Sequence, residues 1–136
     1  MMGIRLNHIL IVDDDELNNY LVKEVIGDLV LVKEIRSETS GWEALDYLKE
    51  KKASGDFPEM IIVDVKMPEM DGFEFLERYE DLFFNDFKNT RIAVATSSHR
   101  EYDRMKAAQY PSVNLFVNKP LDEVKLNYIF KALFEV

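Results

Sequence analysis

The fold is decided by residues 60–72, which read Met60-Ile61-Ile62-Val63-Asp64-Val65-Lys66-Met67-Pro68-Glu69-Met70-Asp71-Gly72. The run from Met60 to Val63 is apolar without interruption, as expected of a strand that is buried on both faces of a sheet. Asp64 ends this strand, and Pro68 and Gly72 predict that a loop follows it. The segment therefore predicts a central strand with a single carboxylate at its carboxyl end.

Short apolar runs alternate with segments of helical periodicity along the whole chain. Strands are predicted at residues 9–12, 31–35, 60–63, 91–96 and 115–118. Apolar residues spaced by three and four positions predict helices at residues 16–26, 42–54 and 73–84, between Ser98 and Pro111, and from Val124 nearly to the C-terminus. Because parallel strands need crossover helices that cover the sheet, this order predicts one α/β domain over residues 1–136. We expect a five-stranded parallel sheet with helices on both faces, doubly wound like flavodoxin.

Polar residues mark several of the predicted helix ends. Asp15 is a candidate N-cap for the first helix, which Gly27 is expected to close. The pairs Ser40/Glu43 and Ser98/Glu101 have the Ser-x-x-Glu spacing of a capping box, so each predicts that a helix begins there.

Composition excludes several classes of protein. The 136 residues include 17 Lys and Arg against 26 Asp and Glu, a formal net charge of -9, and such a surface repels nucleic acid and anionic lipid. There are no cysteines, so disulfides and zinc-thiolate sites are excluded, and a cytoplasmic location is expected. The five glycines are scattered and form neither a Walker loop nor a dinucleotide-binding fingerprint.

Four of the five predicted strands end in polar residues that can do chemistry, namely Asp13-Asp14, Asp64, Thr96 and Lys119. Ligands bind at the carboxyl ends of the strands in such sheets, so these side chains are expected to meet. Three carboxylates in one cleft repel one another, and Mg²⁺, which prefers oxygen ligands, would compensate them. Asp64 stands alone and is the candidate nucleophile toward phosphorus, with Thr96 and Lys119 receiving phosphoryl oxygens.

Each of these residues also has an ordinary structural interpretation when it is taken singly. An acidic turn most often caps a helix, and an acid before a Pro/Gly loop is most often a turn residue. His8, His99 and Trp42 are interpreted as ordinary packing or surface residues, because no acid or second histidine at ligand spacing accompanies them. The evidence for a site is that independent features fall at the same end of successive strands.

These residues resemble the receiver domain of two-component response regulators, the CheY-like family, over nearly the whole chain. The matching segments are Ile9 to Asp15, Ile62 to Gly72, Ala95-Thr96-Ser97 and Val117-Asn118-Lys119-Pro120. The resemblance implies a phosphoacceptor signalling protein with at most self-phosphorylation and self-dephosphorylation. Its expected donor is a sensor histidine kinase or histidine-phosphotransfer protein that docks near Leu17, Asn18 and Leu21, and its output is an unidentified protein target, since no output domain is expected.

The resemblance also implies a role for each site residue. Asp64 would accept the phosphoryl group, and Asp13, Asp14, Asp64 and the backbone carbonyl of Lys66 would hold Mg²⁺. Lys119 would contact the phosphoryl group, with a cis peptide before Pro120. Thr96 would move toward that group, and Phe116 would swing inward into the vacated space. Lys66 is also predicted to hinder the water that hydrolyses the phosphorylated aspartate.

The chain departs from the family pattern in two segments. A shorter turn that commonly contains glycine is replaced by residues 110–114, Tyr110-Pro111-Ser112-Val113-Asn114. The segment of residues 79–89 is longer than is usual in the family. Two other functions stay open. One is a haloacid-dehalogenase-type phosphatase. Residues 13–17 partly mimic the signature sequence of that family, although Leu17 replaces the expected Thr or Val. The other is a receiver-like interaction module that is not phosphorylated.

Overall fold

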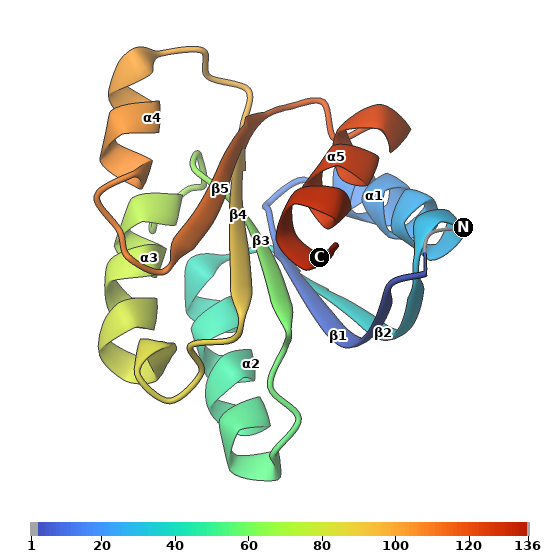
Figure 1. Cartoon of the computed structure of the whole chain (residues 1–136). Helices are drawn as coiled ribbons and strands as arrows, with labels where there is room; N and C mark the ends of the chain where they lie inside the picture. Colours follow the sequence, from blue (N-terminus) through green and yellow to red (C-terminus); the bar gives the residue numbers. More distant parts are fainter. Residues whose placement is uncertain (1–2, 136) are drawn as a thin grey trace.

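The structure, a computed structural model, describes residues 3–135 and contains one parallel sheet between two layers of helices (Figure 1). The strands are β1 (Arg5–Val12), β2 (Leu31–Glu38), β3 (Met60–Asp64), β4 (Arg91–Thr96) and β5 (Val113–Asn118). The helices are α1 (Glu16–Leu29), α2 (Gly41–Ser54), α3 (Gly72–Tyr79), α4 (Glu101–Ala107) and α5 (Glu123–Phe134), and a π-helical turn, η1 (Glu80–Phe84), continues α3. Within these described residues, no helix is long and apolar enough to cross a membrane.

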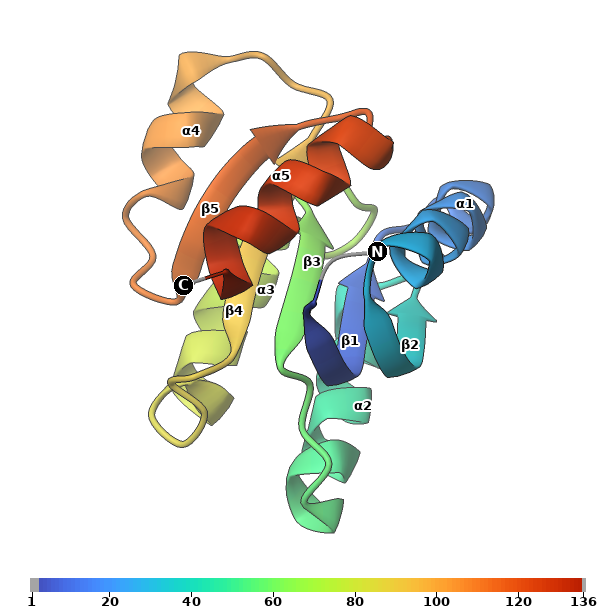
Figure 2. The same ribbon diagram turned by 45° about the vertical axis from the view of Figure 1, so that its right-hand side comes forward.

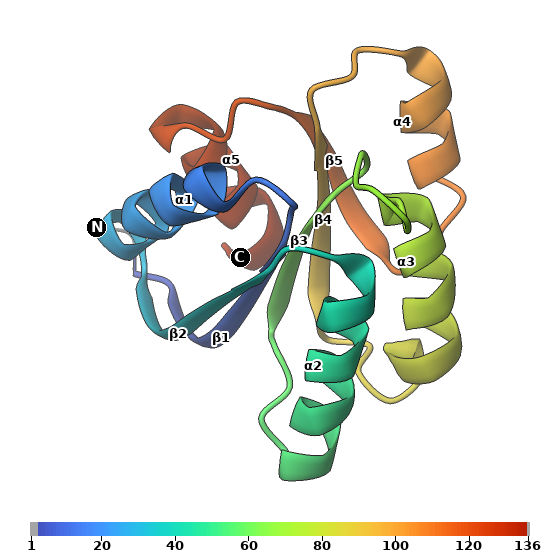
Figure 3. The ribbon, with the colours of Figure 1, turned by 180° about the vertical axis from the view of Figure 1, so that it is seen from behind.

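The sheet has the order β2-β1-β3-β4-β5, and all its pairings are parallel. Helices α1 and α5 cover one face, while α2, α3 and α4 cover the other (Figures 1 and 3). Figure 2 shows α5 lying across the face near β4 and β5, with α1 beside β1. The predicted doubly wound α/β fold is therefore confirmed, and β1 and β3, which carry the acids, are adjacent strands.

A separate apolar core lies on each face of the sheet. Residues of β3 are buried at every position and contribute alternately to the two cores, because successive side chains of a strand point to opposite faces. Ile61 and Val63 face α2 and α3, whereas Met60 and Ile62 face α1 and α5. This packing on both faces fixes the position of β3 in the sheet, and with it the position of Asp64 at the strand end.

Several element boundaries differ from the predicted ones. β1 begins at Arg5 because residues 5–8 alternate between exposed and buried positions, a pattern that the search for continuous apolar runs missed. α1 continues past Gly27 to Leu29, so the prediction that Gly27 closes it is wrong. Ser98 does not cap α4: its hydroxyl accepts a hydrogen bond from the backbone N–H of Arg100 at 3.2 Å, and Arg100 is the N-cap residue. The caps at Asp15 and Ser40 are confirmed.

The two segments that depart from the family pattern contact each other. Glu80, the first residue of η1, accepts hydrogen bonds from the backbone N–H of Ser112 at 2.9 Å and from its hydroxyl at 2.6 Å. Asn114 accepts a hydrogen bond from the backbone N–H of Ile92 at 2.8 Å, where the pairing of β4 with β5 shifts register. The longer helix region and the longer turn therefore form one connected structure at the amino end of β4.

We predict that the Gly72→Ala variant is less stable than the wild type by about 1–3 kcal/mol, the usual cost of overpacking. A Cβ at Gly72 would overlap with the backbone oxygen of Asp64. Gly27→Ala is the matched control, since a Cβ there meets nothing within 4 Å and alanine favours a helix by about 0.5–1 kcal/mol over glycine. Urea unfolding of both variants measures the difference. A free energy of unfolding for Gly72→Ala equal to that of the wild type would contradict the close packing of Gly72 against Asp64.

Candidate functional site

The predicted site residues meet at the carboxyl edge of the sheet. Asp13 and Asp14 follow β1, Asp64 ends β3, Thr96 ends β4 and Lys119 follows β5. Carboxylate oxygens of the three acids lie within 4.8 Å of one another. Asp13 and Asp64 are buried, whereas Asp14 is exposed, so the cluster opens to solvent on the side of Asp14.

The ammonium group of Lys119 lies between the two buried carboxylates. Its Nζ is 2.6 Å from Oδ2 of Asp13 and 3.5 Å from Oδ2 of Asp64. The backbone N–H of Lys119 donates a hydrogen bond to the carbonyl of Thr96 at 2.9 Å, and the peptide bond to Pro120 is cis. The cis bond implied by the family resemblance is thus present, and the lysine is tied by its backbone to β4 and by its side chain to β1 and β3.

Asp13 is oriented by polar groups at the start of α1. Its carboxylate accepts hydrogen bonds from the backbone N–H of Asp15 at 3.0 Å and from the side-chain amide of Asn18 at 3.2 Å. The amide of Asn19, a buried side chain, donates to the carbonyl of Asp13 at 2.8 Å. Sequence reasoning missed these supporting roles of Asn18 and Asn19. The available signal was a pair of asparagines in the first turns of a helix that follows an acidic strand end.

The loop after β4 is held in place by Asn118, another residue whose role was not predicted. Its side-chain amide donates to the carbonyl of Ser98 at 2.6 Å, and the ammonium group of Lys125 donates to the carbonyl of Asn118 at 2.8 Å. The hydroxyl of Thr96 is fully buried and accepts a hydrogen bond from the backbone N–H of Ser98 at 3.1 Å. Thr96 is thus positioned one residue beyond Ala95, the register partner of Asp64.

Burial and neighbouring charges set the protonation of the cluster. The pKa of Asp64 is raised to about 6, and burial of the carboxylate is the largest cause. The charge of Lys119 lowers this pKa, but the charge of Asp13 offsets part of that effect. Burial lowers the pKa of Lys119, but its hydrogen bond to Asp13 and the charge of Asp64 outweigh this, so that its pKa is raised overall. The lysine is therefore charged at neutral pH, and a further cation would favour the ionised form of Asp64.

The residues present fit a divalent metal ion of the hard class. Three carboxylates face one ammonium group, which leaves an excess of two negative charges when all the acids are ionised. The donor atoms are all oxygens, as Mg²⁺ prefers, and one side of the cluster is open for the water ligands that Mg²⁺ retains.

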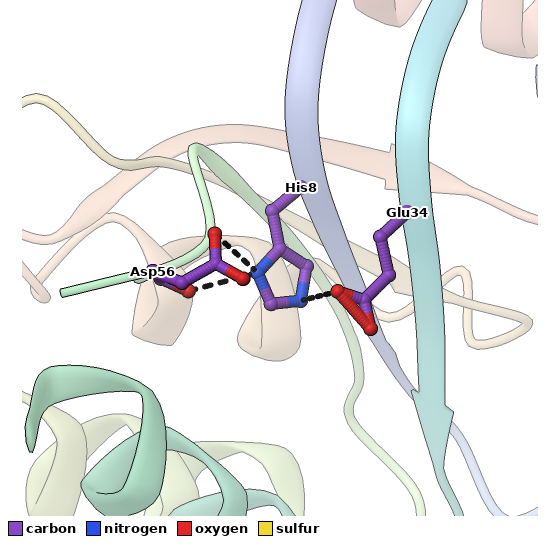
Figure 4. Close-up of side chains that lie close together, drawn as sticks. All are labelled: His8, Glu34 and Asp56. Atoms are coloured by element: carbon purple, nitrogen blue, oxygen red, sulfur yellow. Dashed lines mark hydrogen bonds and ion pairs between the residues drawn. The ribbon is translucent and has the colours of Figure 1, made fainter. Parts of the chain in front are cut away.

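A second cluster, on the opposite half of β1, surrounds His8 (Figure 4). The ring is fully buried, and its Nδ1 lies 2.9 Å from the backbone carbonyl of Asp56, which can only accept a hydrogen bond. Nδ1 therefore donates to this carbonyl, and Nε2 lies 2.6 Å from the hydroxyl oxygen of Tyr47. Figure 4 shows the carboxylates of Asp56 and Glu34 at opposite ring nitrogens. His8 is thus buried and hydrogen-bonded in the core, but Glu34 and Asp56 flank its ring, contrary to the expectation that no acid at ligand spacing accompanies it.

Comparisons with known proteins agree with this geometry. The response regulator receiver domain family matches residues 9–131. An uncharacterized 14.6 kDa protein of Leptolyngbya boryana is 30% identical over 118 residues, which are 87% of this chain and 82% of that protein. The sensor histidine kinase CheAY of Helicobacter pylori is 28% identical over 124 residues, which are 90% of this chain but 14% of the kinase. A crystal structure of a two-component response regulator from Cytophaga hutchinsonii has a TM-score of 0.87 at 29% identity and covers 98% of this chain and 100% of that one.

The chain belongs to the response regulator receiver domain family. This confirms the resemblance to CheY-like receivers and assigns the chain to a family of phosphorelay signalling proteins rather than to a family of classical enzymes. The chain spans only about a seventh of the CheAY kinase, so the activities of that whole protein do not transfer to it.

We predict that Asp64→Asn stabilises the metal-free protein, by about 1–2 kcal/mol at pH 7.5. The folded pKa of about 6 exceeds the ordinary value of 3.8, so ionised Asp64 destabilises the fold. The loss in free energy of unfolding that ionised Asp64 causes is absent below pH 3.8, grows as the pH rises and reaches its full value above pH 6. Urea unfolding in EDTA should therefore show a larger gain at pH 7.5 than at pH 4.5. Asp46→Asn, on the exposed face of α2, is the control and should show neither effect. A gain for Asp64→Asn that did not depend on pH would refute the electrostatic account.

Proposed function

We propose that the chain is a phosphoacceptor that receives a phosphoryl group on Asp64 from a phosphohistidine of a partner protein. The observation that carries this proposal is the position of the Lys119 ammonium group, 3.5 Å from Asp64 and 2.6 Å from Asp13, at the edge where the strands end. A carboxylate beside an ammonium group can attack phosphorus, because the cation stabilises the charge that develops on the phosphoryl oxygens.

The reaction is an exchange of one bond to phosphorus for another. An oxygen of Asp64 attacks the phosphorus atom, the bond between phosphorus and the histidine nitrogen of the partner breaks, and that nitrogen keeps the electron pair. Lys119 would bind one phosphoryl oxygen, and the hydroxyl of Thr96 would donate a hydrogen bond to another. The hydroxyl oxygen accepts from the N–H of Ser98, which leaves its O–H donor available for this hydrogen bond.

Mg²⁺ is the cofactor that the acidic cluster fits. Asp13, Asp14, Asp64 and the backbone carbonyl of Lys66 would hold it. Bound there, the ion would neutralise the repulsion among the carboxylates and polarise a phosphoryl oxygen. The buried Asp13 orients the site through its bonds to Lys119 and α1, whereas the exposed Asp14 is accessible to an ion that keeps some of its water.

Thr96 and Phe116 would carry the signal away from Asp64. They lie on neighbouring strands: Val94 is the register partner of Phe116 and Asn118 that of Thr96, so both side chains point to the same face of the sheet. Movement of Thr96 toward a phosphoryl group would leave space for Phe116 to turn inward. Such a pair of packed arrangements is a two-state element that phosphorylation can bias.

The donor partner would be a sensor histidine kinase or a histidine-phosphotransfer protein, and α1 offers it a surface beside the site. Leu17 and Leu21 are 69% and 55% exposed, and both lie on this helix with Asn18, which also contacts Asp13. The downstream target would be a protein that binds a surface of this chain, and the shape of that surface would change when Phe116 moves. A cytoplasmic location and the absence of nucleic-acid and membrane partners stay predictions.

The haloacid-dehalogenase-type alternative is less well supported by the site. In that mechanism Asp13 would be the nucleophile and Asp64 would have no role, whereas Asp64 lies within 4.8 Å of the other acids and within 3.5 Å of Lys119. A receiver-like module without phosphorylation would not need the complete set of residues that is present here.

We predict that the wild type takes one acid-labile phosphoryl group from phosphorylated histidine kinases or phosphotransfer proteins and that Asp64→Asn takes none. Removal of Mg²⁺ with EDTA should abolish labelling, and Lys119→Met should reduce it strongly because the compensating cation is lost. Phos-tag electrophoresis and intact mass spectrometry measure the transfer. Labelling that persisted in Asp64→Asn, or sustained hydrolysis of a phosphate monoester, would contradict the proposal.

A separate prediction concerns the lifetime of the phosphoryl group. Lys66 is exposed two residues after Asp64, where a long side chain can hinder an approaching water molecule. We expect Lys66→Ala to lose its phosphoryl group several-fold faster than the wild type, as followed by mass spectrometry after removal of the donor. Lys49→Ala on α2 is the control. An unchanged lifetime for Lys66→Ala would show that this side chain does not shield the site.

A further inference from the structure

Helix α4 is attached to the sheet with little apolar contact. Ala107 is its single buried apolar residue, and its other buried residue is the acid Asp103. The carboxylate of Asp103 pairs with the guanidinium group of Arg100 at 3.2 Å, while Tyr102 and Met105 are more than half exposed. Charged and aromatic contacts therefore determine much of how α4 is held, and a change in one such contact can alter the position of the helix.

The contact from α4 to the predicted switch residue is made by Arg104. The Cζ atom of Arg104 lies 5.1 Å from the centre of the Phe116 ring, within the range of a cation–π interaction. Among residues 3–135, no carboxylate oxygen lies within 4.0 Å of a side-chain nitrogen of Arg104, so no ion pair competes with the ring for this guanidinium group. Arg104 thus covers the half-buried ring of Phe116 on β5.

In the proposed switch, inward movement of Phe116 would take its ring away from the guanidinium group of Arg104. The guanidinium group lies against the ring in its present position, and rotation of the ring toward the space beside Thr96 would carry it away from α4. An interaction that is present in only one of two arrangements shifts the equilibrium toward that arrangement.

We propose that Arg104 is a positioning residue that holds Phe116 in its resting arrangement and thereby lowers the affinity of the distant aspartate for a phosphoryl group. The inference rests on the proposed function, in which phosphorylation of Asp64 turns Phe116 inward. By linkage, whatever favours the resting position of Phe116 weakens binding at Asp64 by the same factor.

The test measures how tightly beryllofluoride, a phosphoryl mimic, binds in the presence of Mg²⁺. Removing the contact in Arg104→Met should tighten binding about two- to fivefold, the factor that corresponds to one exposed cation–π contact. Arg104→Lys keeps a cation above the ring and should restore the wild-type affinity. Arg78→Met is the matched control, because it removes a similar contact, Arg78 over Trp42 at 4.6 Å, on the surface formed by α2 and α3.

A spectroscopic measurement separates positioning from a general loss of stability. With fluorinated phenylalanine incorporated into the full chain, the ¹⁹F signal of Phe116, identified by its absence in Phe116→Leu, should shift toward its beryllofluoride-bound position in Arg104→Met but not in Arg78→Met. An unchanged or weaker affinity in Arg104→Met, or an unmoved Phe116 signal, would overturn the role of Arg104 alone. Failure of the wild type to bind beryllofluoride would overturn the proposed function as well.

Discussion

The ammonium group of Lys119 between the carboxylates of Asp13 and Asp64 is the interaction on which the site depends. It joins residues that are 106 positions apart, and it brings the ends of β1, β3 and β5 to one point. A single lysine does not neutralise three acids. Burial, and to a smaller extent the charge of Asp13, raise the pKa of Asp64 even though Lys119 lowers it. The protein therefore has an anionic cleft whose carboxylate oxygens fit a divalent cation.

Much of this arrangement could be predicted from the sequence, because it depends on patterns of short range. Continuous apolar runs such as Met60 to Val63 identify strands that are buried on both sides, and the helices between them require a parallel sheet. In a parallel sheet the carboxyl ends share one edge, so the order of Asp13, Asp64 and Lys119 along the chain already indicated their convergence. The supporting amides of Asn18 and Asn19 could not be predicted as readily, since polar residues at a helix start have many common roles.

Other features depend on long-range packing that no local pattern records. Ser98 has the spacing of a capping residue, yet Asn118 binds the backbone of this loop and α4 starts only at Glu101. Gly27 has the character of a residue that ends a helix, but α1 packs onto the sheet and continues past Gly27 to Leu29. The bond from Glu80 to Ser112 likewise joins two segments that are unremarkable when each is considered alone. In each case tertiary contacts outweigh a local preference of about 1 kcal/mol.

The most direct test of the central claim is a crystal structure of the protein with beryllofluoride and Mn²⁺, in which the manganese position is located by anomalous scattering. We expect one ion bound by the carboxylates of Asp14 and Asp64, with beryllium bonded to an oxygen of Asp64 and a fluorine in contact with Nζ of Lys119. Manganese bound at another place, or beryllofluoride absent from Asp64 while the ion is present, would contradict it.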